Sequence, residues 1–291
     1  MDSCRALIRL LSIAIVTIFA LFLVVFMLRT MALSQPLYKV EIPGFGSALT
    51  VFATGDLELG SPYSSDAYTT TLALGDRVVP TLEVRASADH EWVIYGLGSL
   101  SVWTDGQGEI ETQNWSELKK LKWKKSSQTE GLLLLRDFLS QHSMPKLLIL
   151  VHNRDVAAAR SLMALLGDRE EPTLTLIRAE NHQLNRELRK LRPQWYFGAD
   201  AVMLTQWQVF TALRLDPLAP TDFEWITKDW PAVKTSTSPR LYEELNRRGI
   251  GRILWANDPQ QLKDKITDPH LLGVLTNRPK QILELLKVAG D

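Results

Sequence analysis

Apolar and polar positions follow two periodicities along most of the chain. Short apolar runs rich in β-branched and aromatic residues predict strands at 48–54, 78–86, 91–97, 146–152, 173–179, 194–199, 201–204, 252–257 and 271–277. Amphipathic helical stretches lie between several of them, such as "RDVAAARSLMALLGD", "HQLNRELRKL" and "RPKQILELLK". Strands that alternate with helices predict a parallel sheet covered by helices. A pattern of about 250 residues of this kind fits a closed TIM-type (β/α)8 barrel, with an open doubly wound sheet as the alternative.

The N-terminal segment has a different pattern. From Leu10 to Leu28 the chain reads "LLSIAIVTIFALFLVVFML", which carries no charge and is long enough as a helix to cross a hydrocarbon layer of about 30 Å. The alternative is a cleaved signal peptide, whose apolar region is usually only about 7–15 residues long. We therefore predict a transmembrane signal anchor in residues 1–30, a linker in 31–40 and one barrel domain in 41–291.

The charges near this segment predict its orientation. Arg5 and Arg9 precede the apolar run and Arg29 follows it, so the positive-inside rule favours a cytoplasmic N-terminus. The barrel is then extracytoplasmic, and periplasmic in a Gram-negative bacterium. The single cysteine, Cys4, leaves none for a disulfide or a cysteine zinc site in the barrel. The 33 basic residues balance the 33 acidic ones, so no nucleic-acid partner is expected.

The C-terminal part of the chain has well-marked element boundaries. Ser238-Pro239 predicts a helix start, and Gly249 predicts the end of that helix. The strand that follows ends at Trp255, and Asp258-Pro259 begins the next helix. This order places Trp255 at the C-terminal rim of the sheet, where barrels of this kind carry their active sites. Trp255 is therefore a candidate binding residue.

Two segments of the chain resemble the glycerophosphodiester phosphodiesterase family, metal-dependent barrels that hydrolyse deacylated phospholipids. The first, "LYEELNRRGIGRILWANDPQQLKDKITDPHLLGVLTNRP", resembles the closing helix, strand and helix of that family. The second, "LSVWTDGQGEIETQNWSEL", resembles the segment that follows the family's His-Asp pair, and "GLLLLRDFL" and "KLLILVHN" come next in the expected order. In pattern, the resemblance covers most of residues 48–287.

The resemblance also shows which family residues this chain lacks. The family's His-Arg-Gly, Glu-x-Asp, His-Asp and metal-binding Glu correspond here to Thr54-Gly55-Asp56, Thr81-Leu82-Glu83, Gly96-Leu97 and Leu150. Only one carboxylate of the metal set remains, and a hard divalent cation is held by several oxygens. General acid/base groups contribute typically about 10²–10⁴-fold each, so their loss removes most of the rate. No cofactor is expected, and Mg²⁺ or Ca²⁺ enters only if an active site has been rebuilt.

A few polar residues remain as candidates for the site. Strand alternation places Thr81 and Glu83 on the barrel interior, where Glu83 is a candidate metal ligand and catalytic residue. A structural pair between Glu83 and Arg85 or a lysine is the alternative. His152 ends a strand at the rim and is a candidate catalytic or structural histidine. Asp56 is a candidate binding residue. With Glu58 and Asp66 of the same loop, and with Glu83 and His152, it forms a possible substitute metal site.

Further expectations concern Gly96 and a set of tryptophan and lysine residues. Gly96 is expected to leave a small neutral depression at the rim that tolerates a histidine. Three tryptophans in loop-like surroundings and the lysine-rich segment 117–127 are candidates for contact with a bilayer, with burial and a solvated helix end as the alternatives. The tryptophans are Trp207, Trp225 and Trp230.

The expected function follows from these departures. We predict a membrane-anchored protein similar to glycerophosphodiester phosphodiesterases, a catalytically impaired pseudoenzyme that binds a lipid-derived phosphodiester or a protein partner. The alternative is an active metal-dependent phosphoric diester hydrolase of phospholipid metabolism with a rebuilt active site.

Overall fold

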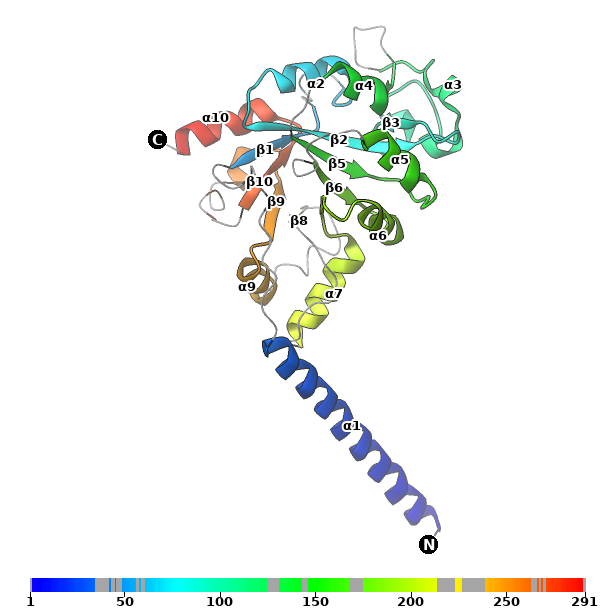
Figure 1. Ribbon diagram of the computed structural model, residues 1–291, viewed down its shortest axis with the longest axis vertical. Helices are drawn as coiled ribbons and strands as arrows, with labels where there is room; N and C mark the ends of the chain where they lie inside the picture. The colour runs from blue at the N-terminus through cyan, green and yellow to red at the C-terminus, as the bar shows by residue number, and fades with distance from the viewer. Residues whose placement is uncertain are drawn as a thin grey trace.

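The computed structural model describes residues 2–34, 42, 45, 49–55, 58, 61–124, 131–142, 146–167, 175–213, 223–226, 239–262, 266, 268 and 271–289. They form a long N-terminal helix, α1 (Asp2–Ser34), and an α/β barrel (Figure 1). Within α1, the 19 residues Arg9–Met27 are long and apolar enough to cross a membrane, and none of this span is buried. A membrane anchor and a signal sequence both have these properties.

Eight parallel strands build the barrel. Their order in the sheet is β7-β6-β5-β2-β1-β10-β9-β8. They are β1 (Thr50–Ala53), β2 (Val78–Ala86), β5 (Leu147–Val151), β6 (Thr175–Ala179), β7 (Tyr196–Phe197), β8 (Phe223–Ile226), β9 (Gly251–Trp255) and β10 (Leu271–Thr276). The first strand pairs with the last, with Val51 opposite Val274, which confirms the TIM-type barrel over the open doubly wound sheet. Within the described ranges, no pairing joins β7 to β8.

Helices follow the strands and cover the outside of the barrel (Figure 1). They are α2 (Ser65–Leu72), α4 (Leu135–Gln141), α5 (Ala158–Leu166), α6 (His182–Leu191), α7 (Ala201–Ala212), α9 (Pro239–Arg247) and α10 (Pro279–Ala289). The shorter helices are η2 (Leu100–Val102), η3 (Ile110–Thr112), α3 (Trp115–Leu118) and η5 (Pro259–Gln261).

The strands are buried on both faces, as is usual for a parallel sheet. In β5, Ile149 packs in the outer cluster that contains Leu162 of α5. Its neighbours Leu148 and Leu150 pack in the inner cluster with Phe52. Alternate residues of one strand therefore belong to different cores.

An antiparallel excursion extends the end of β2. The strands β3 (Trp92–Ile94) and β4 (Leu133–Leu134) pair there, β3 against Val84–Ala86 and β4 against β3. The prediction that residues 91–97 form a barrel strand is therefore wrong, since the third barrel strand is β5. The physical reason is the length of β2, whose last residues extend past the barrel and leave an edge that β3 pairs with.

Two further assignments differ from the sequence prediction. Residues 201–204 begin α7 rather than forming a strand, because the Asp200 carboxylate accepts a hydrogen bond from the Met203 amide at 2.9 Å and caps the helix. Residues 223–226, which the sequence placed in a loop, form β8 and pair with β9. The predicted helix end at Gly249 is confirmed, with a φ of 67° that favours glycine.

The close approach of β10 to β1 gives a test of the pairing between the first and the last strand. A Cβ at Gly273 would lie 2.4 Å from the Thr50 carbonyl oxygen and 2.5 Å from the Phe52 ring. We expect Gly273→Ala to lower the free energy of unfolding by about 1–3 kcal/mol, because the inner core has no room for the methyl group. The measurement is urea denaturation of the full chain in detergent.

The matched control is Gly98→Ala, since a Cβ at Gly98 meets no atom within 4 Å. It should change the free energy of unfolding by less than about 0.5 kcal/mol. Equal midpoints for the two variants would contradict this packing of β10 against β1.

Candidate active site

The candidate site lies where the parallel strands of the barrel end. Along β2, Thr81 pairs with Leu148 and Glu83 with Leu150, both of which pack in the inner core. Leu150 in turn pairs with Arg178 of β6. Because paired residues of neighbouring parallel strands face the same side, Thr81, Glu83 and Arg178 all lie on the inner face, as the alternation of β2 predicted.

A histidine between two carboxylates forms the centre of the site. His152, directly after β5, lies with its Nδ1 2.9 Å from Glu180 Oε1 and its Nε2 3.2 Å from Glu83 Oε2. The Tyr63 hydroxyl donates to the same Glu83 oxygen at 3.4 Å. The side chains of His152 and Glu83 are about one-tenth exposed, whereas that of Glu180 is 46% exposed. We call Glu83, His152 and Glu180 the Glu-His-Glu cluster.

The charges of the cluster depend on one another. Burial alone would lower the pKa of His152, but the carboxylates of Glu180 and Glu83 outweigh it and raise that pKa to about 9. Burial would raise the pKa of Glu180, and the nearby His152, Arg178 and Arg85 lower it instead. At neutral pH the ring is therefore an imidazolium. Its Nδ1 lies close to Glu180, whereas its Nε2 lies near Glu83 but has no hydrogen-bond partner among the described atoms.

Two arginines support this cluster from neighbouring elements. Arg178 is buried, and its Nε donates to the Ala199 carbonyl at 2.8 Å. Arg85 donates from Nη1 to Glu111 Oε1 at 2.6 Å and to the His152 carbonyl at 3.2 Å. The alternative interpretation that paired Glu83 with Arg85 is therefore wrong, because Arg85 pairs with Glu111 while Glu83 contacts His152.

The described side chains do not fit the divalent cation that the family resemblance implies. A histidine ligand must lose its proton to bind a metal, so a cation here would have to displace the proton that His152 holds beside Glu83 and Glu180. Among the described residues, no group of three His, Cys, Asp or Glu side chains is placed to hold a metal ion. Of the other candidate ligands, Asp56 lies outside the described residues, and Glu58 and Asp66 are exposed.

The remaining candidate residues lie around the cluster. Thr81 is fully buried, and its hydroxyl has no hydrogen-bond partner among the described atoms. Trp255 is partly buried at the end of β9, against the inner core. Sequence reasoning missed Arg178 and Glu180, although "LIRAEN" places them two positions apart at a strand end, the same signal that identified Thr81 and Glu83.

Gly96 does not leave the neutral depression that was expected. A Cβ at this position would lie 1.6 Å from Glu83 Oε2 and 2.7 Å from the Tyr63 hydroxyl. The space beside Gly96 is therefore filled by a buried carboxylate and its partner. A histidine at Gly96 would have to displace the end of the Glu83 side chain, and its tolerance by the rim stays a prediction.

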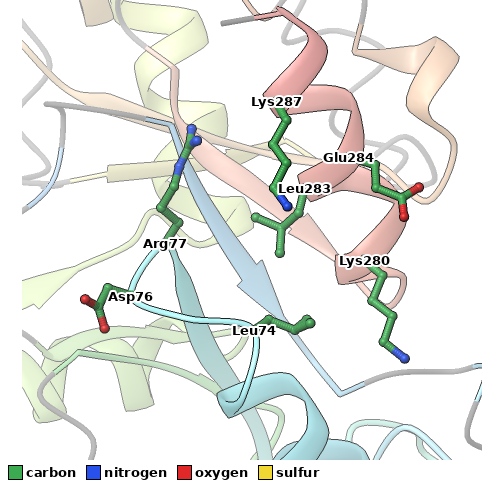
Figure 2. A pocket seen from close by; sticks show the side chains of 7 residues that line it. All are labelled: Leu74, Asp76, Arg77, Lys280, Leu283, Glu284 and Lys287. Carbon is green, nitrogen blue, oxygen red and sulfur yellow. The ribbon is translucent and has the colours of Figure 1, made fainter.

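Two surface hollows lie away from this cluster. One of about 400 Å³ is formed by the turn before β2 and by α10 (Figure 2). It is lined by Leu74, Asp76, Arg77, Lys280, Leu283, Glu284 and Lys287. A second, of about 320 Å³, lies beside β3 and α5. The first is at the N-terminal end of β2, opposite to the rim, and neither includes the Glu-His-Glu cluster.

The fold and the charged rim define a TIM-type barrel protein with a candidate ligand site at the C-terminal ends of its strands. Solved structures identify the type of barrel more closely, because this chain has the fold of the glycerophosphodiester phosphodiesterases. A glycerophosphodiester phosphodiesterase from Parabacteroides distasonis has a TM-score of 0.64 and 17% identity, covering 84% of this chain and 98% of that one. One from Agrobacterium tumefaciens has a TM-score of 0.62 and 16% identity, covering 81% and 99%.

A third similar structure is a phosphodiesterase from Oleispira antarctica in complex with its product sn-glycerol-3-phosphate. Its TM-score is 0.65 at 18% identity, and the match covers 82% of this chain and 97% of that one. No protein-family model and no curated protein matches the chain. At these identities the likeness establishes a shared fold.

The raised pKa of His152 predicts how stability depends on pH. An unfolded histidine has a pKa of about 6.5, and the folded value is about 9. The stabilisation is therefore fully present below the unfolded pKa and is lost as the pH rises through the folded one. We expect the free energy of unfolding to fall between neutral pH and pH 9–10 in the native chain, and to fall much less in His152→Gln. Urea denaturation across this range provides the measurement.

The control is His90→Asn, because His90 is exposed and its φ of 63° suits asparagine. This variant should keep the native pH dependence. A His152→Gln protein with an unchanged pH dependence would show that the cluster does not hold a protonated histidine.

Proposed function

We propose that this protein is a membrane-anchored barrel, similar to glycerophosphodiester phosphodiesterases, that has lost metal-dependent hydrolysis and binds a lipid-derived phosphodiester at its rim. The observation that carries the proposal is the Glu-His-Glu cluster, in which a protonated histidine stands between the carboxylates. The fold similarity supports the class of ligand, since one similar structure holds sn-glycerol-3-phosphate.

The chemistry of the rim supports the loss of hydrolysis. Phosphodiester cleavage by the family's route needs a divalent cation on the phosphoryl oxygens and a residue that protonates the leaving alkoxide. His152 holds its protons between two carboxylates with a pKa of about 9, well above the range in which a histidine exchanges protons readily near neutral pH. Thr54 and Thr81 offer hydroxyls in place of the family's histidine and glutamate.

The same cluster supports anion binding. His152, Arg178 and Arg85 all act on the carboxylate of Glu180, the most exposed member of the cluster. The Glu180 carboxylate is thus an anion, supplied by the protein itself, that lies among three positively charged side chains. A phosphodiester carries one negative charge at neutral pH, so it can replace the Glu180 carboxylate there without changing the net charge of the site. Trp255 adds an aromatic wall at the same rim.

The apolar span in α1 supports a position on the membrane. An uncleaved anchor with a cytoplasmic N-terminus places the barrel on the extracytoplasmic side, near the lipids from which such phosphodiesters derive. A protein partner at the rim and an active hydrolase rebuilt around Glu83, Asp56 and His152 are the competing functions. In the active alternative, Mg²⁺ or Ca²⁺ would be bound with the help of Asp56.

The first test is hydrolysis of glycerophosphocholine by the full chain in nanodiscs, with Mg²⁺, Ca²⁺ or Mn²⁺ supplied in turn. We expect no turnover above the protein-free control, because the described residues offer no cation site and His152 keeps its protons beside two carboxylates. Metal-dependent release of sn-glycerol-3-phosphate that disappears in Glu83→Gln would establish the active alternative.

The second test is ligand affinity, measured by calorimetry with glycerophosphocholine. Glu180→Gln removes the internal anion and keeps a similar shape, so we expect it to bind about tenfold more tightly, a gain of about 1.4 kcal/mol. Glu117→Gln, an exposed glutamate of α3, is the matched control and should bind as the native chain does. If Glu180→Gln binds no better than this control, the anion does not occupy the position of Glu180.

A further inference from the structure

The helix α7 carries no charged residue, which is unusual for a helix on the outside of a barrel. Its inner side packs in the protein through Met203, Leu204 and Trp207, which are 4%, 2% and 3% exposed. The prediction that Trp207 contacts a bilayer is therefore wrong, because this ring is buried. The apolar residues that α7 presents to solvent are different ones.

The outer side of α7 forms an exposed apolar stripe. Val202, Val209 and Leu213 are 45%, 52% and 51% exposed. Their spacing of seven and four residues places them on one side of the helix, over about 16 Å at 1.5 Å per residue. The exposed residues between them, Thr205, Gln206 and Ala212, are uncharged. We call Val202, Val209 and Leu213 the α7 stripe.

The C-terminal end of the α7 stripe lies at the same end of the barrel as the start of β1, which follows the anchor helix in the chain. The helix begins directly after β7, so it runs back from the C-terminal rim toward the N-terminal end of the barrel, where Val209 and Leu213 lie. The chain from α1 enters β1 at Thr50, which is also at the N-terminal end. In Figure 1, α1 leaves the barrel on the side of α7 and α9, away from α2 and α4.

Basic side chains flank the stripe on both sides. The helices α6 and α9 both pack against α7 and run in the same direction. Arg189 and Lys190 lie in the last turn of α6, and Arg247 lies in the last turn of α9. The side chains of Lys190 and Arg247 are 61% and 42% exposed. Although each of these two pairs with a glutamate, basic residues outnumber acidic ones in both segments, 182–192 and 239–248.

We propose that the α7 stripe lies in the interface of the bilayer that α1 spans, with the basic ends of α6 and α9 against anionic head groups. An apolar stripe between basic flanks is the pattern of helices that lie in a membrane surface. Because α1 holds the barrel beside the bilayer, the effective concentration is high and a stripe of a few residues is sufficient to dock it. The docked barrel lies on its α7 side, which keeps the rim beside the head groups. This orientation does not depend on what the rim binds.

The experiment measures how deeply a spin label at Val209 enters the bilayer. The full chain, with Cys4→Ser and Val209→Cys, is labelled and placed as single copies in nanodiscs of phosphatidylcholine and phosphatidylglycerol. The accessibility of the label to oxygen and to a water-soluble nickel complex is then compared. We expect the ratio to shift toward the value for lipid, with a loss of nickel accessibility.

Val102→Cys in the same Cys4→Ser chain is the matched control. Val102 is 51% exposed in η2, within the β3–β4 excursion at the other end of β2, and should remain accessible to nickel. Equal, water-like accessibility at both positions would overturn the proposal. Protection of Val209 only when a nanodisc holds two copies would also overturn it, because the stripe would then be an interface between protein chains.

Discussion

The parallel pairing of β1 with β10 determines where every other part of this protein lies. Val51 opposite Val274 joins the first strand to the last, and the register continues through β2, β5 and β6. Since all of these strands run the same way, their C-terminal ends meet at one rim. Side chains from β2, β5 and β6 that are about 70 and 30 residues apart in sequence therefore come into contact there.

The charged residues of the rim are separate from the apolar residues that hold the barrel together. The inner core, which includes Phe52, Leu148 and Leu150, is a cluster of apolar side chains distinct from the charged residues of the rim. Replacement of a rim ligand therefore leaves the packing that holds the barrel together intact. At the rim itself, burial makes an unpaired charge costly, and charged side chains there lie close to side chains of opposite charge. His152 provides a positive charge beside the buried carboxylate of Glu83 and the partly exposed one of Glu180.

The inside and the outside of the barrel also differ in what their residues contact. Strand residues alternate between the inner and the outer core, whereas a helix presents its outer side to whatever surrounds the molecule. The other outer helices carry charged residues, as α6 and α9 do, and α7 carries none. The uncharged helix α7 distinguishes one side of the barrel from the others. The chain that follows α1 joins the barrel at the end where α7 finishes.

The sequence by itself determined the features that depend on neighbouring residues. The alternation of β2 placed Thr81 and Glu83 inward, the apolar run of residues 10–28 indicated a membrane-length helix, and Gly249 marked a helix end. Only the tertiary structure decided which charges meet. Glu83 contacts His152 rather than Arg85, residues 91–97 pair outside the barrel, and Gly96 lies against a carboxylate. These outcomes depend on strand register and on the length of β2 beyond the barrel, which bring distant residues together and leave no local pattern in the sequence.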